Sequence, residues 1–195
     1  MSGEDEYTNA AREGHRAVGR YVIEFSQLFF RMRTVIEHRL NTDPPQLGML
    51  VMGEATAQPI ANVFFSMCRL VGNLDSDEEA IARALSNAVA EAIKTRNDVA
   101  HGDWFVGWGA IDGPPEPPTL QRTKPQRKDG ALVQYVWNIE DLDQMADDLL
   151  DLTGLVSAFG NLCVGLHPRQ QEEEIRVRDI LILQDGKVLR EGPRA

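Results

Sequence analysis

Three residues in one short stretch of the chain carry side chains that can do chemistry on a phosphate ester. They are Arg96, Asn97 and His101. A guanidinium stabilises negative charge on a phosphate through its fixed fork of donors, and an imidazole transfers protons near neutral pH. An amide one helical turn before the imidazole can orient it or a substrate. The stretch 96–101 is therefore the leading candidate for a catalytic site.

Arg96 has an unusual position in the helix that we predict here. Projected on an ideal helix, it falls between Val89 and Ala92, in the middle of an apolar stripe. A guanidinium at such a position needs an anionic partner, because an unpaired buried charge costs several kcal/mol. Glu54, a lone carboxylate in an apolar region, is one candidate, and a partner subunit or a ligand phosphate is another. The alternative is that Arg96 only forms a structural ion pair and His101 only marks the helix end.

Arg96 and His101 form an R-x4-H motif, in which a polar residue, Asn97, follows the arginine. This motif near the end of a long helix resembles that of HEPN domains (higher eukaryotes and prokaryotes nucleotide-binding), and the resemblance extends over residues 5–166. It implies a helical homodimer with both motifs in one cleft, acting as a metal-independent RNA endonuclease without a cofactor. His101 would act on the ribose 2′-hydroxyl or the leaving oxygen. Arg96 would stabilise the phosphate, and Asn97 would orient one of them.

The same resemblance allows a second function. Some HEPN domains bind nucleotides or have lost activity, so the chain is alternatively a non-catalytic dimerisation module or a nucleotide- or RNA-binding module. In that case Arg96 and His101 are structural. Catalytic members act as toxins or defence effectors, which implies an antitoxin or another neutralising protein as a partner.

A basic segment and a tryptophan are further candidates for contact with a nucleic acid. Lys124, Arg127 and Lys128 end a proline-rich loop in an otherwise acidic chain, and cations of this kind bind phosphates. Trp104 could stack on a base. The alternatives are that the loop is simply solvated and that Trp104 packs on the helices.

Apolar residues at helical spacing predict the main elements. A helix from near Glu6 to before Asp43 has a stripe of Val18, Val22, Phe25, Phe29, Met32 and Ile36, widened by Tyr21, Leu28 and Val35. A region over 47–71 is expected to be kinked or split at Pro59. A third helix begins with a capping box of Ser76 and Glu79 and ends near Gly102, and a fourth follows Asn138 and reaches Cys163.

Between and after these helices the apolar pattern indicates strands. Residues 104–109 and 131–137 predict a long-looped hairpin, and Asp185-Gly186 between apolar runs predicts a second one. The expected fold is mainly α: an up-and-down bundle of four to five helices with an inserted two-stranded β-hairpin and a short C-terminal β-hairpin. The expected domains are a HEPN-like domain over 1–167, with its β insertion at 104–137, and a tail over 168–195.

Composition narrows the class of protein. The 195 residues hold 20 Lys and Arg against 30 Asp and Glu, a net charge of −10, which argues against nonspecific wrapping of duplex DNA. Cys68 and Cys163 have no metal-ligand or CxxC spacing, so we expect buried, reduced thiols and no metal site. Without a secretory leader or a membrane span in the sequence, we expect a cytoplasmic protein.

Overall fold

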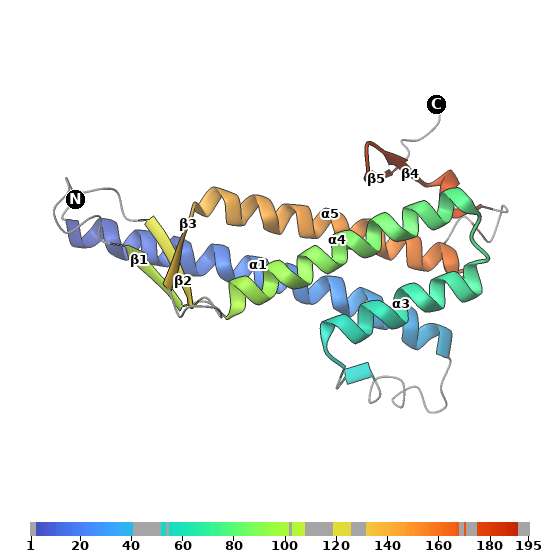
Figure 1. The fold of residues 1–195 in the computed structure, drawn as a ribbon, viewed down its shortest axis with the longest axis horizontal. Coiled ribbons are helices and arrows are strands. Elements are labelled where there is room, and N and C mark those ends of the chain that lie inside the picture. Colours follow the sequence, from blue (N-terminus) through green and yellow to red (C-terminus); the bar gives the residue numbers. More distant parts are fainter. Residues whose placement is uncertain are drawn as a thin grey trace. The chain divides into compact units, whose positions relative to one another are not determined.

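The computed structural model of the chain describes residues 3–40, 52–53, 55–101, 103–107, 119–125, 132–167, 170 and 175–190. Most of these residues are helical, in α1 (Gly3–Leu40), α3 (Ala57–Gly72), α4 (Ser76–Ala100) and α5 (Ile139–Cys163) (Figure 1). One antiparallel sheet contains β1 (Asp103–Gly107), β2 (Thr119–Pro125) and β3 (Leu132–Trp137), and another contains β4 (Leu181–Gln184) and β5 (Lys187–Arg190). The prediction of a mainly helical protein with a C-terminal hairpin is confirmed.

The chain divides into two compact units. Unit 1 contains the described residues of 1–24 and 95–148, and unit 2 contains those of 25–94 and 149–195. Each of α1, α4 and α5 therefore contributes one part to each unit. The predicted domain boundary between 167 and 168 stays a prediction.

Unit 2 contains a tightly packed apolar core. Its most deeply buried side chains include Leu28, Met32, Ile36, Ile60, Phe64, Leu85, Val89, Val156 and Phe159. The backbone of α5 comes close to α3 and α1 at Gly160, where a Cβ atom would lie 2.8 Å from the Phe64 ring and 3.2 Å from Val35. A glycine is what permits this approach.

The predicted stripe of α1 is buried along most of its length. Phe25, Phe29, Met32 and Ile36 are buried, whereas Val18 and Val22 are half-buried. The widening residues Tyr21, Leu28 and Val35 are also buried, at 1%, 0% and 3% exposure. The buried face of α1 is therefore centred on Tyr21, Leu28 and Val35. The predicted stripe lies to one side of this centre.

The helix predicted over 47–71 is shorter than expected. Residues 41–51 and 54 lie outside the described residues, and α3 begins only at Ala57, after the extended N-cap Thr56. Pro59 consequently lies in the first turn of α3, where the missing N–H has no helical acceptor to lose. The expected kink is wrong, because Pro59 helps to begin α3, but the alternative, a split, is present just before it: residues 52–53 are helical and residues 55–56 are not.

The capping box of α4 is one residue earlier than predicted. The Asp75 carboxylate accepts hydrogen bonds from the N–H groups of Asp77 and Glu78, each at 3.0 Å, and the Glu78 carboxylate accepts the Asp75 N–H at 3.0 Å. The N-cap is thus Asp75 rather than Ser76, and its partner is Glu78 rather than Glu79. The two hydrogen bonds that the Asp75 carboxylate accepts lower its pKa, and the bond from the Glu78 N–H has the larger effect.

The Glu78 carboxylate also holds the segment after α5, which belongs to unit 2. Arg176 donates from Nε to Glu78 Oε1 at 3.1 Å, and Glu78 is only 1% exposed. The hairpin that follows buries Leu181 and Val188. Its turn places Asp185 and Gly186 at φ 51° and 76°, as expected for a type I′ turn.

The insertion in unit 1 has three strands rather than the predicted two. Strand β2 lies between β1 and β3 and pairs with both, so β1 and β3 do not form a hairpin with each other. The sequence prediction missed β2 because it treated the whole proline-rich stretch as a loop. In the structure, β2 begins after Pro118 and ends at Pro125. The prolines border the strand, so its interior keeps the N–H groups that the pairing needs.

Cys68 and Cys163 are buried free thiols, as predicted. Hydrogen bonding with Cys68, and then burial, raise the pKa of the Cys163 thiol. Cys163 also packs against the end of α3, because its Sγ lies 3.2 Å from where a Cβ of Gly72 would be. None of the helices in the described part of the chain combines the length and apolar composition needed to cross a lipid bilayer.

Candidate functional site

The last turns of α4 bring the three predicted catalytic residues onto one helix end in unit 1. The helix ends at Ala100, and the His101 N–H donates to the Asn97 carbonyl at 3.1 Å. This bond continues the helical pattern to His101 and so fixes the position of its Cα relative to Asn97. The side chains of Asn97 and His101 are both exposed. A substrate can therefore reach the amide and the imidazole.

Arg96 is half-buried and lies beside Asn97. Its Nη1 contacts Asn97 Oδ1 at 3.4 Å, a long and therefore weak hydrogen bond. The neighbouring apolar positions Ala92, Ile93 and Val99 are buried. The sequence predicts Arg96 in the middle of the apolar stripe, and the structure places it at partial depth, where solvent still has access to the residue.

Tyr21 is a residue near this site, although the sequence pattern places it only in an apolar stripe. It lies on α1 in unit 1 and is 1% exposed. Burial raises the pKa of its phenol to about 12, while the positive charge of Arg96 acts in the opposite direction. The Arg96 guanidinium is thus within electrostatic reach of the phenol. The signal in the sequence that could have pointed to Tyr21 is its hydroxyl group, which stands among the apolar residues of the stripe.

Two other arginines of unit 1 form ion pairs. Arg16 donates to both carboxylate oxygens of Asp143, at 3.0 Å and 2.6 Å. Arg20 bonds to Asp143 at 3.3 Å and to Asp147. The hydrogen bond from Arg16 is the first cause of the lowered pKa of the Asp143 carboxyl. These pairs join α1 to α5, and their cations are already neutralised.

The remaining predicted residues are only partly placed. Glu54, Arg127 and Lys128 lie outside the described residues. Trp104 lies in β1, where its register partner is Arg122, and Lys124 lies in β2 opposite Val133. The sheet register thus puts the backbone of Trp104 opposite Arg122, two residues before Lys124. Whether Glu54 pairs with Arg96 stays a prediction.

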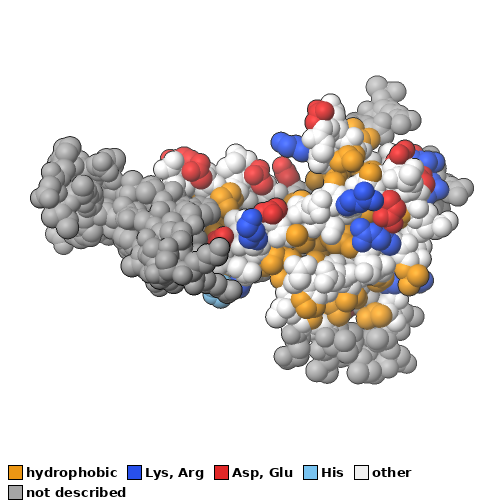
Figure 2. Space-filling model, viewed as in Figure 1, with side chains coloured by type: hydrophobic (Ala, Val, Ile, Leu, Met, Phe, Trp, Pro, Cys, Tyr) orange, Lys and Arg blue, Asp and Glu red, His pale blue; other side chains and the backbone are white. Residues whose placement is uncertain are grey.

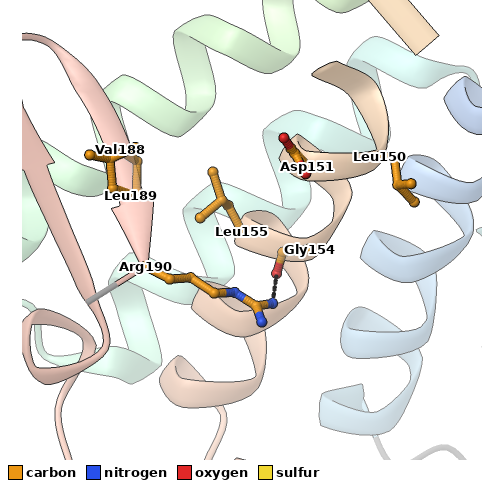
Figure 3. A pocket seen from close by; sticks show the side chains of 7 residues that line it. All are labelled: Leu150, Asp151, Gly154, Leu155, Val188, Leu189 and Arg190. Carbon is orange, nitrogen blue, oxygen red and sulfur yellow. Dashed lines mark hydrogen bonds between the residues drawn. The ribbon is translucent and has the colours of Figure 1, made fainter. Parts of the chain in front are cut away.

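A cavity of about 440 Å³ lies elsewhere, in unit 2, between α5 and β5 (Figure 3). Its lining is Leu150, Asp151, Gly154, Leu155, Val188, Leu189 and Arg190. The Arg190 guanidinium reaches across to α5 and donates to the Gly154 carbonyl at 2.9 Å. The cavity contains none of the predicted site residues. Among the described residues, no three His, Cys, Asp or Glu side chains are grouped as metal ligands would be.

Comparisons with family models, with curated proteins and with solved structures find no match to this chain. The residues at the end of α4 and their geometry are therefore what indicates a function.

Proposed function

We propose that the chain is a HEPN-like, metal-independent RNA endonuclease whose catalytic residues are Arg96, Asn97 and His101. The observation that supports the proposal is their arrangement at the end of α4. An exposed imidazole, an exposed amide and a half-buried guanidinium follow one another within two helical turns. These are the groups that phosphodiester transfer needs.

The reaction uses the ribose 2′-hydroxyl as an internal nucleophile. His101 accepts the proton of this hydroxyl while its oxygen attacks the phosphorus. The bond from phosphorus to the 5′-oxygen then breaks, and that oxygen takes a proton from an acid. The products are a 2′,3′-cyclic phosphate and a 5′-hydroxyl. Arg96 stabilises the negative charge on the phosphate oxygens, and Asn97 orients the imidazole or the phosphate.

A homodimer completes this scheme. The reaction needs a base for the 2′-hydroxyl and an acid for the 5′-oxygen, and the R-x4-H motif supplies one imidazole per chain. Two copies that place their motifs in one cleft supply both groups. Lys124, Arg127 and Lys128 would bind flanking phosphates, and Trp104 would stack on a base. We expect such an enzyme to act in the cytoplasm as a toxin or defence effector restrained by a neutralising protein.

A non-catalytic module is the second candidate, and charge favours it. The chain carries a net charge of −10, and Arg16 and Arg20 in unit 1 are held by Asp143 and Asp147. Electrostatic attraction of a polyanion is therefore weak. In this function Arg96 and His101 would hold a dimer interface or a bound nucleotide, and no bond would be broken.

Cleavage of mixed RNA in the presence of EDTA tests the proposal. We expect the wild-type chain to cleave RNA between pH 6 and pH 8, and Arg96→Ala and His101→Ala each to slow cleavage by about 100-fold or more. The matched controls are Arg83→Ala, an exposed arginine on the same helix, and His15→Ala, an exposed histidine of unit 1. Both should cleave like the wild type.

The ends of the products give a second readout. Cyclic phosphate termini would identify the 2′-hydroxyl mechanism, and a contaminating nuclease would survive in the His101→Ala preparation. If purified wild-type protein cleaves no RNA over the pH range, the enzymatic proposal fails. Retained binding of RNA or a nucleotide, measured by fluorescence anisotropy, would then support the module.

A further inference from the structure

Two thiols lie where α3 packs against α5 in unit 2. On α3, Phe64, Cys68 and Gly72 are four positions apart, so they follow one line along the helix. The residues at both ends of this line contact α5. The Phe64 ring lies 2.8 Å from where a Cβ of Gly160 would be. Cys163 Sγ lies 3.2 Å from where a Cβ of Gly72 would be. Cys68 therefore lies between two close contacts with the last turns of α5.

The two thiols also contact each other. A hydrogen bond with Cys68 is the first cause of the raised pKa of the Cys163 thiol. Cys163 follows Gly160 by three positions on α5, which puts both residues on the side of that helix that packs against α3. Both cysteines are free thiols. The packing of the helices and the hydrogen bond thus agree in placing the two sulfur atoms together.

The pair lies in apolar surroundings. Cys68 is 0% exposed and Cys163 is 7% exposed. The rings of Phe65 and Phe159, which lie between the same two helices, have their centroids 6.1 Å apart. Figure 2 shows hydrophobic side chains gathered over α3, at the place labelled in Figure 1. A single thiol in such surroundings is inert and acts as a small apolar side chain, whereas two thiols in contact can also be joined covalently.

We propose that Cys68 and Cys163 are a redox modification site, at which a reversible disulfide joins α3 to the end of α5. The oxidant is a small peroxide such as hydrogen peroxide. It is uncharged, so it enters a closed apolar site at a lower cost than a charged disulfide such as oxidised glutathione. In a reducing compartment such a bond is transient and follows the redox conditions. The inference concerns unit 2 alone, and it stands whether or not the α4 end cleaves RNA.

The reaction begins at Cys163. It is the more exposed of the two thiols and the last residue of α5, and helix ends open more readily than helix interiors. Its thiolate attacks one peroxide oxygen and breaks the O–O bond, which gives a sulfenic acid and, after protonation of the leaving hydroxide, water. The Cys68 sulfur then attacks the Cys163 sulfur, and the sulfenic hydroxyl leaves as a second water. Two thiols lose two electrons and two protons in total, and one peroxide is reduced to two waters.

Peroxide treatment of the native full chain tests the proposal. Catalase stops the reaction, and the remaining thiols are alkylated in denaturant before mass spectrometry. We expect the wild type to lose both thiols and to yield a linked pair of peptides, about 2 Da lighter than their sum because two hydrogens leave. Dithiothreitol should restore both thiols. Cys68→Ala and Cys163→Ala are the matched variants, and neither should form an intrachain link.

Urea unfolding gives a second readout. The bond closes a loop of about 95 residues, so the oxidised wild type should unfold at a urea concentration about 1 M or more above that of the reduced form. The alanine variants keep every methionine, so they control for methionine oxidation, and peroxide should not raise their midpoints.

Two results would overturn the proposal. One is a native wild type that keeps both thiols in peroxide while the urea-unfolded chain loses them. The other is a disulfide that non-reducing electrophoresis finds only between two chains. Neither result depends on RNA cleavage, which is scored separately.

Discussion

At the scale of single residues, the candidate site joins three side chains from one helix end to a phenol on another helix. Arg96 keeps its charge at any pH that the protein meets, so its surroundings must accommodate a permanent cation. Partial exposure, the contact with Asn97 and the nearby Tyr21 together provide those surroundings. Because the residue is only partly buried, its guanidinium remains accessible to a phosphate.

Tyr21 should make the stability of the protein depend on alkaline pH. Its phenol has a pKa near 10 in the unfolded chain and about 12 in the folded one, so folding favours the neutral form. The stability contributed by Tyr21 is complete below pH 10 and is lost as the pH rises toward 12. We expect denaturant unfolding to show a loss of about 2 kcal/mol over this window, and Tyr21→Phe to abolish most of it.

Arg96 gives this prediction an internal check. Its positive charge lowers the pKa of Tyr21, so Arg96→Gln should raise that pKa further. Ultraviolet absorbance of the phenolate, taken as the difference from the Tyr21→Phe variant, follows the titration. An unchanged titration in Arg96→Gln would show that the guanidinium does not act on the phenol.

At the scale of elements, the close approach of α5 to α3 and α1 in unit 2 depends on one missing side chain. A Cβ at Gly160 would lie 2.8 Å from the Phe64 ring and 3.2 Å from Val35. Phe64 is fully buried and has Phe65 and Phe159 as ring neighbours. The ring therefore has little room to move away from an added methyl group.

Two alanine substitutions should have opposite effects. Gly160→Ala forces the helices apart, and we expect it to lower the free energy of unfolding by about 1–3 kcal/mol. Gly19→Ala, within α1, meets nothing within 4 Å, so higher helix propensity should raise it by about 0.5–1 kcal/mol. Urea unfolding measures both. A stabilised Gly160→Ala would mean that α5 can shift without cost.

Elements with a strong local pattern were predictable, and those that depend on neighbours were not. The stripe of α1 and the Asp185-Gly186 turn follow from periodicity and turn chemistry. The start of α4 has a run of Asp75, Ser76, Asp77, Glu78 and Glu79, in which two overlapping capping boxes fit. The structure selects the earlier one, in which Glu78 also binds Arg176, a residue far away in the sequence.

The candidate site shows the same division. The order of Arg96, Asn97 and His101 along one helix end is a local property, and the sequence reveals it. The depth of Arg96 and the nearness of Tyr21 depend on how α1 packs against α4 in unit 1, which no spacing within either helix specifies. Strand β2 was missed for a related reason. The prediction used the number of prolines in the segment and not their positions, which are at the ends of the strand.

At the scale of the whole molecule, the net charge of −10 affects the electrostatic interaction of the chain with every other charged molecule. Repulsion between two copies acts at long range, whereas the apolar contacts of a dimer interface act only at short range. Salt shortens the range of the repulsion, from about 10 Å at 0.1 M to about 3 Å at 1 M. It leaves apolar attraction intact or strengthens it.

The homodimer of the proposed function should therefore form more tightly as salt is added. We expect the dissociation constant of the wild-type dimer to fall several-fold between about 0.05 M and about 0.5 M sodium chloride, measured by sedimentation equilibrium. Weaker association at high salt would instead identify an interface held by ion pairs.

The double use of Glu78 affects how the chain can be shortened or fused. One carboxylate completes the first turn of α4 through the Asp75 N–H and holds the segment after α5 through Arg176. Cutting the chain before Arg176 would leave an acid with 1% exposure deprived of its cation. An engineer who wishes to replace the terminal hairpin with a tag should keep Arg176 or exchange Glu78 for glutamine, which still caps the helix.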